Sequence, residues 1–280
     1  MLTKEFIREI QNFVASKPRS VQEIAQHIKK NWRTADRYID QIIADYGTLA
    51  TRTFREGTRG ALKIVYWATP DKMSHSVFQE QLEKEILRAR WKEDFSAFDI
   101  YQYIAKGKKS LSIQTDASEE RVAFNQITKF YEKAEKQLLI FSGNLTFLNF
   151  RQGKKSVFDT LDGLVKKGIT IKVLCRVDLN GKENIERLLS LNMKYGRNAV
   201  EVRHRFHPLR ATIIDKQCFD IKEIKEPTGR LRELDKRLFI FYNIREGEWV
   251  EWLTRIFWKL FNASIDAQIR LEQLNMISTK

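Results

Sequence analysis

The first part of the chain carries apolar side chains at helical spacing. Phe6 and Ile10 belong to a stripe that repeats every three or four residues, which predicts an amphipathic helix. Pro18 ends this helix, because the residue before a proline is pushed out of the α conformation. Ser20 and Glu23 have the spacing of a capping box, so a second, short helix is predicted to start after Ser20.

A third helix and a β-hairpin are predicted next. Arg33 starts the helix with Thr34 as its N-cap, and Gly47 lies just past its end, where glycine is favoured. Two runs of alternating apolar and polar residues follow, at Thr48–Arg55 and Ala61–Ala68. A short loop with two glycines joins these runs, which is typical of a hairpin.

This order of helices and hairpin resembles the winged helix-turn-helix family over residues 4–68. The resemblance implies that the third helix enters the major groove of DNA while the hairpin, or wing, follows the adjacent backbone or minor groove. Arg33 and Arg37 are four residues apart on the outward face of the third helix, and Gln41 is one turn further on. Two other interpretations stay open, a merely solvated helix face and a protein-interaction module. The DNA-contacting residues that we predict are Arg33, Thr34, Arg37, Gln41, Arg52, Arg55, Thr58, Arg59 and Lys63.

The segment 71–117 is predicted to be a helical linker. Apolar residues from Val77 to Ala89 recur about every four positions, which indicates an amphipathic helix that needs a packing partner. Of its own domain, the next domain and a second chain, we favour a second chain, so this is a possible dimerisation helix. An aromatic patch and the basic run Lys106–Lys109 follow, which suit stacking of single-stranded bases. We favour instead that the aromatic residues anchor the linker; they are Trp91, Phe95, Phe98, Tyr101 and Tyr103.

Residues 118–280 alternate between helical and strand patterns. Alternation of this kind predicts an α/β domain, with a mostly parallel or mixed sheet between layers of helices. The predicted helices are Glu119–Lys136, Lys155–Lys167, Lys182–Tyr195 and Gly247–Ala263, and the predicted strands are Gln137–Ser142, Ile169–Val177, Ala199–Phe206, Arg210–Ile221 and Leu238–Tyr242.

Residues 206–215, FHPLRATIID, resemble the phospholipase D signature, H-x-K-x-x-x-x-D. Arg210 stands at the lysine position and Asp215 at the aspartate position, but Pro208 stands where the family has its nucleophilic histidine. His207 is one residue out of register, and a one-residue slip on a strand turns a side chain to the other face. With softer matches near Asn144 and after Asn243, the resemblance covers about residues 118–264.

The resemblance implies a phospholipase-D-like fold that has lost its catalysis. An enzyme of this family needs two such motifs facing each other, and this chain has one copy without the nucleophile. A winged helix followed by such a domain resembles the archaeal TrmB-type regulators, which implies a C-terminal domain for dimerisation or for sensing a small molecule. A phosphodiesterase or nuclease in which His207 moves into place in a dimer is the alternative. The residues of the possible anion or ligand pocket are Asn144, His207, Arg210, Asp215 and Asn243.

Composition supports a polyanionic partner. The formal charge of +14 from 50 Lys and Arg against 36 Asp and Glu favours nucleic acid. Cys175 and Cys218 are too far apart in sequence to suggest zinc, so no metal or cofactor is predicted. No apolar run approaches the roughly 18 residues that span a bilayer, and a cytoplasmic, nucleoid-associated protein is expected.

The sequence therefore predicts a sequence-selective double-stranded DNA-binding protein, a transcription regulator that acts as a homodimer. Its predicted domains are a winged helix at 1–70, a helical linker at 71–117 and an α/β domain at 118–280. The basic stretch RHRFHPLR, residues 203–210, has three interpretations: an anion pocket, a second DNA-contacting surface, or an edge strand protected by charge.

Overall fold

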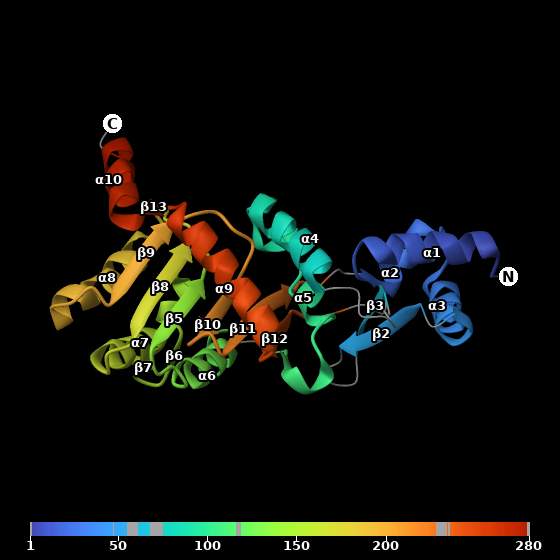
Figure 1. Ribbon diagram of the computed structural model, residues 1–280, viewed down its shortest axis with the longest axis horizontal. Helices are drawn as coiled ribbons and strands as arrows, with labels where there is room; N and C mark the ends of the chain where they lie inside the picture. Colours follow the sequence, from blue (N-terminus) through green and yellow to red (C-terminus); the bar gives the residue numbers. More distant parts are fainter. Residues whose placement is uncertain are drawn as a thin grey trace.

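The chain folds into a mixed α/β structure with one large mixed sheet. The computed structural model describes residues 2–46, 48–54, 61–67, 75–115, 119–227, 234 and 236–278. We call the described residues up to 67 the N-terminal module and those from 75 onward the α/β body. Figure 1 places the N-terminal module at one end of the long axis and the C-terminal helix at the other.

The N-terminal module contains three helices and a small antiparallel sheet. Ser20 and Glu23 form the capping box that the sequence predicts, with Glu23 N to Ser20 Oγ at 3.1 Å and Ser20 N to Glu23 Oε2 at 2.7 Å. The three strands have the spatial order β1-β3-β2, and β2 and β3 form the predicted hairpin. The elements are α1 (Lys4–Ser16), β1 (Arg19–Ser20), α2 (Val21–His27), α3 (Trp32–Tyr46), β2 (Leu49–Phe54) and β3 (Leu62–Trp67).

The start of α3 differs from the prediction. The side-chain oxygen of Asn31 accepts a hydrogen bond from the Thr34 amide at 2.9 Å, and the Asn31 carbonyl accepts from the Ala35 amide at 3.1 Å. Asn31 is therefore the N-cap, and the prediction that Thr34 caps this helix is wrong. An asparagine is a stronger cap than a threonine, and here it lies two residues before the predicted first turn.

The α/β body is built on an eight-stranded sheet with the order β13-β9-β8-β5-β10-β11-β12-β4. Strands β5, β8 and β9 are parallel to each other, whereas the remaining neighbours pair antiparallel. A separate two-stranded ribbon joins β6 (Arg151–Gln152) and β7 (Lys155–Ser156). The strands of the large sheet are β4 (Lys109–Gln114), β5 (Gln137–Phe141), β8 (Thr170–Cys175), β9 (Val200–His204), β10 (Ala211–Ile214), β11 (Cys218–Lys225), β12 (Leu238–Ile244) and β13 (Ile265–Asp266).

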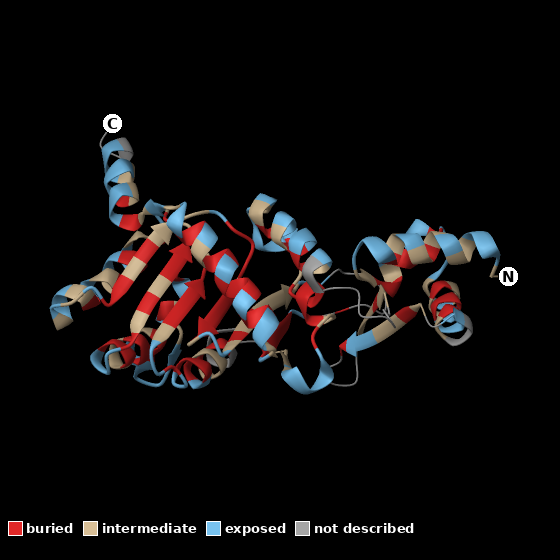
Figure 2. Ribbon diagram, viewed as in Figure 1, coloured by how far each residue is buried: buried red, intermediate tan, exposed pale blue. Residues whose placement is uncertain are grey.

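Helices cover both faces of this sheet, as the alternating pattern predicts. Alternate residues of each strand point to opposite faces, so Leu139 and Phe141 join one apolar core while Leu138 and Ile140 join the other. Figure 2 shows the buried residues concentrated on the strands and on the inner faces of the helices. The first core is covered by α4 (His75–Arg88), α5 (Phe98–Tyr101) and α9 (Gly247–Asn262), and the second by α6 (Glu119–Tyr131), α7 (Val157–Lys166), α8 (Lys182–Tyr195) and α10 (Ala267–Ser278).

The amphipathic helix α4 packs on its own chain, so the preference for a partner chain on this face is wrong. Leu82 and Ile86 are buried in the same core as α9. The indole Nε1 of Trp252 on α9 donates to the Gln79 carbonyl of α4 at 3.1 Å, and Lys259 Nζ lies 2.7 Å from Glu83 Oε1. The apolar stripe that needed a partner therefore finds it within the body.

Two further segments differ from the predictions. The long strand predicted at Arg210–Ile221 is a hairpin of β10 and β11, because Asp215 and Lys216 turn the chain at φ of 51° and 57°. The segment 71–117 is not wholly helical, since its last described residues form β4, which pairs with β12 at the edge of the sheet. The aromatic anchoring that we favoured is confirmed for Phe95, Phe98 and Tyr101, which are buried in the core beside α9. Among the described residues, no helix is long and apolar enough to cross a membrane.

Candidate nucleic-acid interface and body cavity

The outward face of α3 presents the side chains predicted to read DNA. Arg33, Arg37 and Gln41 are exposed, whereas Ala35 and Ile39 on the opposite face are buried against α1 and α2. The i, i+4, i+8 spacing places the three polar side chains in one row along the helix. The row has the length and the donor groups to reach base edges in a major groove.

The strand cations predicted to contact the DNA backbone are engaged within the chain. Lys63 Nζ lies 2.7 Å from Asp36 Oδ1 and 2.9 Å from Asp40 Oδ1, both on α3. The Arg52 guanidinium lies 5.6 Å from the Tyr101 ring centroid of the body. Lys63 therefore ties the hairpin to α3, and Arg52 faces the body. The remaining predicted wing residues, Arg55, Thr58 and Arg59, lie outside the described residues.

Two lysines that the sequence prediction missed lie beside the start of α3. Lys29 and Lys30 are exposed in the turn between α2 and α3, where Lys29 has a φ of 52°. A helix N-terminus attracts phosphate through its free N–H groups and its dipole, and neighbouring cations add to this. The signal was present in the sequence, because two lysines directly precede the Asn31 cap and Arg33.

The other face of the hairpin docks on the α/β body. Phe54 is 1% exposed and meets Phe98 of α5 edge-on, with ring centroids 5.9 Å apart. Tyr66 contacts the same ring at 5.4 Å. Tyr101, next to them on α5, contacts Tyr242 of the sheet at 5.0 Å. A continuous set of aromatic contacts therefore links the hairpin to the body.

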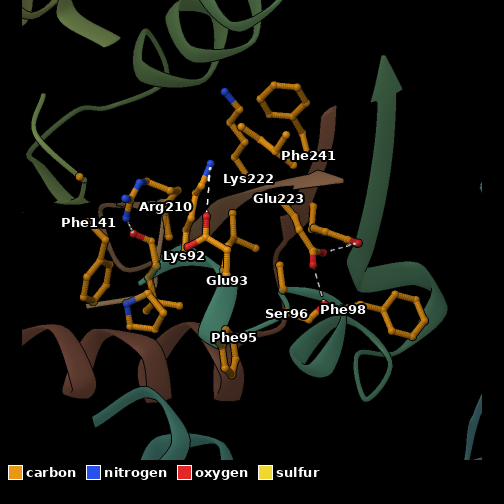
Figure 3. Close-up of a pocket in the computed structure, with 18 of the residues that line it drawn as sticks. Lys92, Glu93, Phe95, Ser96, Phe98, Phe141, Arg210, Lys222, Glu223 and Phe241 are labelled. Carbon is orange, nitrogen blue, oxygen red and sulfur yellow. Dashed lines mark hydrogen bonds and ion pairs between the residues drawn. The ribbon is translucent and has the colours of Figure 1, made fainter. Parts of the chain in front are cut away.

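A cavity of about 1210 Å³ lies between the N-terminal module and the body. Lys17, Pro18 and Phe54 contribute to its wall from the module, and the body contributes the segment 91–99 and the ends of several strands. Figure 3 shows Lys92 and Glu93 between Arg210 on one side and Glu223 on the other. The predicted anion pocket overlaps this cavity in part.

Two of the five predicted pocket residues line the cavity, Asn144 and Arg210. Arg210 is partly buried; its Nη1 donates to the Leu209 carbonyl at 2.8 Å. Burial, together with the like charge of Arg176, lowers the pKa of Arg210 to about 10. A Cβ on Gly143 would lie 2.7 Å from Arg210 Nη2, so the guanidinium rests against a backbone that has no side chain.

His207 belongs to the core rather than to the cavity. Its ring is 4% exposed and packs edge-on against Phe141 at 5.3 Å, and Nε2 donates to the Leu174 carbonyl at 3.0 Å. Burial, with the nearby charge of Arg210, lowers the pKa of His207 to about 3. The imidazole is therefore held neutral and hydrogen-bonded, and it does not line the cavity.

Asp215 and Asn243 also lie elsewhere. Asp215 accepts hydrogen bonds from the amides of Glu135, Lys136 and Gln137 at 2.7, 2.9 and 2.7 Å, at the end of β10 opposite to Arg210. Five residues of strand separate the two side chains by about 16 Å, so they do not share a site. Asn243 lies on β12 between Asp220 and Ser110, and its side-chain oxygen accepts from Arg245 Nε at 3.1 Å. Neither residue lines the cavity.

Two buried carboxyl groups in the cavity wall were missed by the sequence prediction. Burial, reinforced by the charges of Glu223 and Glu85, raises the pKa of Asp99 to about 7, and burial raises the pKa of Asp220 to about 7. Neither position carried a motif, because both acids sit in ordinary amphipathic segments. Within the described part of the chain, no group of three or more His, Cys, Asp or Glu side chains is arranged to hold a metal ion.

Comparison with known proteins finds similarity in structure and none in sequence. No protein-family model and no curated protein matches the chain. Nuc from Salmonella typhimurium, a phospholipase D family member, is similar at 12% identity and a TM-score of 0.41, over 57% of this chain and 98% of its own. NucT from Helicobacter pylori is similar at 12% identity and a TM-score of 0.39, over 57% of this chain and 99% of its own.

One similar structure extends over both parts of the chain. TrmBL2, an archaeal chromatin protein whose structure shows a novel mode of DNA binding, is 11% identical, with a TM-score of 0.40 over 94% of each chain. At such identities and TM-scores, function is not transferred from one chain to another.

Proposed function

We propose that the chain is a sequence-selective double-stranded DNA-binding protein, a transcription regulator whose N-terminal module is a winged helix-turn-helix. The observation that carries the proposal is the exposed row of Arg33, Arg37 and Gln41 on α3. The helix is held by a buried apolar face and by the Asn31 cap, so the row is presented by a rigid element. Arginine and glutamine are the side chains that pair with the edges of guanine and adenine.

The surroundings of α3 support contact with phosphates. Lys29 and Lys30 lie at its N-terminal end, and the overall charge of +14 favours association with a polyanion. The order of helices and the three-stranded sheet β1-β3-β2 fit a winged helix. Because Lys63 is paired with Asp36 and Asp40, and Arg52 lies toward Tyr101 of the body, α3 and the turn before it carry most of the contact in this proposal.

The α/β body has a structural role in the proposal, and the protein acts as a homodimer. A phospholipase-D-type reaction needs an accessible histidine to attack phosphorus. His207 is buried and bonded to a backbone carbonyl, and Pro208 lines the cavity in its place. These contacts favour binding over phosphodiester cleavage.

Binding to duplexes selected from a random pool tests the proposal. Arg37→Ala should weaken the selected duplex by about 1–3 kcal/mol, and scrambled duplexes less, if the arginine pairs with a guanine. Arg187→Ala is the matched control, because Arg187 is a body arginine that lies over Phe158. A slope near zero of log K against log salt, or equal losses on both duplexes, would contradict base reading by α3.

A cleavage assay separates the enzymatic alternative from binding. The same duplexes, incubated with the full chain in the presence of a chelator and run on a denaturing gel, should stay intact. Strand scission that disappears in His207→Ala would assign the chain to the phosphodiesterases instead. Sedimentation with and without the selected duplex measures the subunit count and tests the dimer independently.

A further inference from the structure

Two exposed aromatic rings meet beside the cavity in the body. Trp91 is 49% exposed and Phe206 is 39% exposed, and their ring centroids are 5.4 Å apart at 74°. Trp91 precedes the short helix η1 (Lys92–Asp94), and Phe206 follows β9, so two distant segments form this corner. Large apolar rings that touch each other yet remain exposed to solvent are a feature of ligand sites, because packing in the core does not explain their position.

Two arginines continue from this corner into the cavity. The Arg176 guanidinium lies 5.5 Å from the Trp91 ring centroid, and its Nε lies 2.6 Å from Asp178 Oδ2. Trp91, Arg176 and Arg210 all line the same cavity. The site therefore has an aromatic end at Trp91 and a cationic end at Arg210.

Asp178 pairs with Arg176, whereas Arg210 has no ion pair of its own among the described residues, although Glu93 lies close enough to attract it. Among the residues that the structure describes, none brings a carboxylate within ion-pair distance of Arg210, whose hydrogen bond goes to the neutral Leu209 carbonyl. Burial and the like charge of Arg176 lower the pKa of Arg210 more than the opposite charge of Glu93 raises it, so holding Arg210 charged costs free energy. An anion placed between the two guanidinium groups would recover that free energy and accept hydrogen bonds from both.

We propose that this cavity binds a nucleoside phosphate, with the base against Trp91 at the corner that Phe206 adjoins outside the cavity wall, and the phosphate between Arg176 and Arg210. A flat heteroaromatic ring stacks on exposed indole and phenyl rings, and a phosphate matches the forked donors of arginine. The volume of about 1210 Å³ exceeds that of common small-molecule sites, which is about 300–1,000 Å³. Gly143 has no side chain, so the Arg210 guanidinium can lie directly against its backbone.

The proposed site is independent of DNA binding by α3, but it lies in a cavity whose wall both parts of the chain form. The cavity wall includes Lys17 and Phe54 of the N-terminal module as well as the residues of the body. The binding itself is measured without DNA, so its outcome does not depend on the proposed function.

Calorimetry on the full chain with adenosine 5′-monophosphate as the probe tests the proposal. Saturable binding is expected, with adenosine and ribose 5-phosphate each about tenfold weaker or more, because each lacks one end of the ligand. Arg210→Met should reduce the affinity for the monophosphate to that for adenosine. Arg176→Met should lower the same affinity, and because Arg176 is less buried, this variant is less apt to disturb folding. Trp91→Ala should reduce the monophosphate to the affinity of ribose 5-phosphate.

Matched controls and contrary outcomes are available within the chain. Arg187→Met and Tyr46→Ala remove an arginine and an exposed aromatic ring far from the cavity, and both should bind as the parent does. No binding at millimolar monophosphate, or ribose 5-phosphate binding as tightly as the monophosphate, would overturn the proposal. A single-stranded oligonucleotide that depends on Trp91 and is not displaced by the monophosphate would also overturn it, in favour of a surface for unpaired nucleic acid.

Discussion

Lys63 Nζ lies 2.7 Å from Asp36 Oδ1, and this ion pair joins the β-hairpin to the helix α3 that we propose to read DNA. Asp40 receives the same ammonium group at 2.9 Å. Although burial acts to lower it, the hydrogen bonds with Asp36 and Asp40 raise the pKa of Lys63. Lys63 thus compensates two carboxylates on the helix that, in the proposed function, approaches DNA phosphates.

Replacing Lys63 is predicted to weaken DNA binding, because the carboxylates of Asp36 and Asp40 are then left without their cation. In Lys63→Met, Asp36 and Asp40 keep their negative charge near the DNA, so affinity should fall for selected and scrambled duplexes alike. Stability should fall by about 1 kcal/mol, as for a partly exposed pair. Fluorescence anisotropy across a salt series measures the first effect and urea unfolding the second.

The double variant Asp36→Asn with Asp40→Asn is the matched control. It releases Lys63 from both carboxylates, so affinity should rise and the salt slope should become steeper by about one unit. Equal affinities for the parent and the double variant would show that α3 does not approach phosphate.

Asp215 is predicted to contribute to stability and not to any reaction. Its carboxylate accepts three backbone amides at the start of β5, two of them at exposed residues, so losing the acceptor should cost about 1–3 kcal/mol in total. Asp215→Ala should therefore destabilise more than Asp215→Asn, because asparagine keeps an acceptor and tolerates the positive φ of 51°. Urea unfolding measures the order of the two variants. Unchanged stability in Asp215→Ala would remove this role.

Phe54 is predicted to hold the N-terminal module on the body. Replacing a fully buried phenylalanine by alanine costs about 3–5 kcal/mol, and here the loss falls on the contact with Phe98. Phe54→Ala should lower the melting temperature and increase the radius of gyration measured by small-angle scattering. Tyr46→Ala removes an aromatic ring that is 52% exposed and should change neither quantity.

The buried carboxyl of Asp99 is predicted to make stability fall as pH rises. Burial, with Glu223 and Glu85 against the weaker opposing charges of Lys225 and Lys17, raises the pKa of Asp99 from 3.8 to about 7. The folded state then binds the proton more tightly than the unfolded state. The stabilisation is full below pH 3.8 and is lost as pH rises through about 7.

Asp99→Asn should flatten that part of the pH profile of the unfolding free energy. Asparagine mimics the protonated acid at every pH, so the variant should gain stability relative to the parent at pH 8. Glu132→Gln, an exposed residue in an ion pair with Lys155, is the control and should leave the slope unchanged. Asp220, whose pKa is also raised to about 7, makes the unfolding free energy fall with pH in the same way. The Asp99→Asn variant should therefore keep part of the parent's slope.

Local signals in the sequence account for most of the elements but for less of the site. The Ser20 and Glu23 spacing, the hydrophobic stripes and the alternation of helices and strands depend on near neighbours, so they predicted the elements well. The β10–β11 turn was missed because Asp215 and Lys216 adopt positive φ without a glycine to signal it. Edge strand β4 was missed because its residues, KSLSIQ, are largely polar.

The site depended on contacts that no spacing encodes. The Arg210 and Asp215 spacing suggested a shared pocket, but the two residues lie at opposite ends of β10 and serve different contacts. The ion pairs of Lys63 and the stacking of Arg52 on Tyr101 join residues far apart in sequence. Basic residues on the hairpin therefore predict a positive charge there, whereas only the fold determines which neighbours those side chains contact.

The pairing of β4 with β12 has a consequence for the order in which the chain is made. Ile113 pairs with Ile240, so this edge of the sheet cannot form until residue 240 has left the ribosome. The N-terminal module is complete at Trp67 and has its own apolar core, so it can fold during synthesis. Phe54 would then remain without its partner Phe98 until the body forms around it. The nascent chain thus presents a folded α3 row before it has acquired the aromatic contacts that fix its orientation.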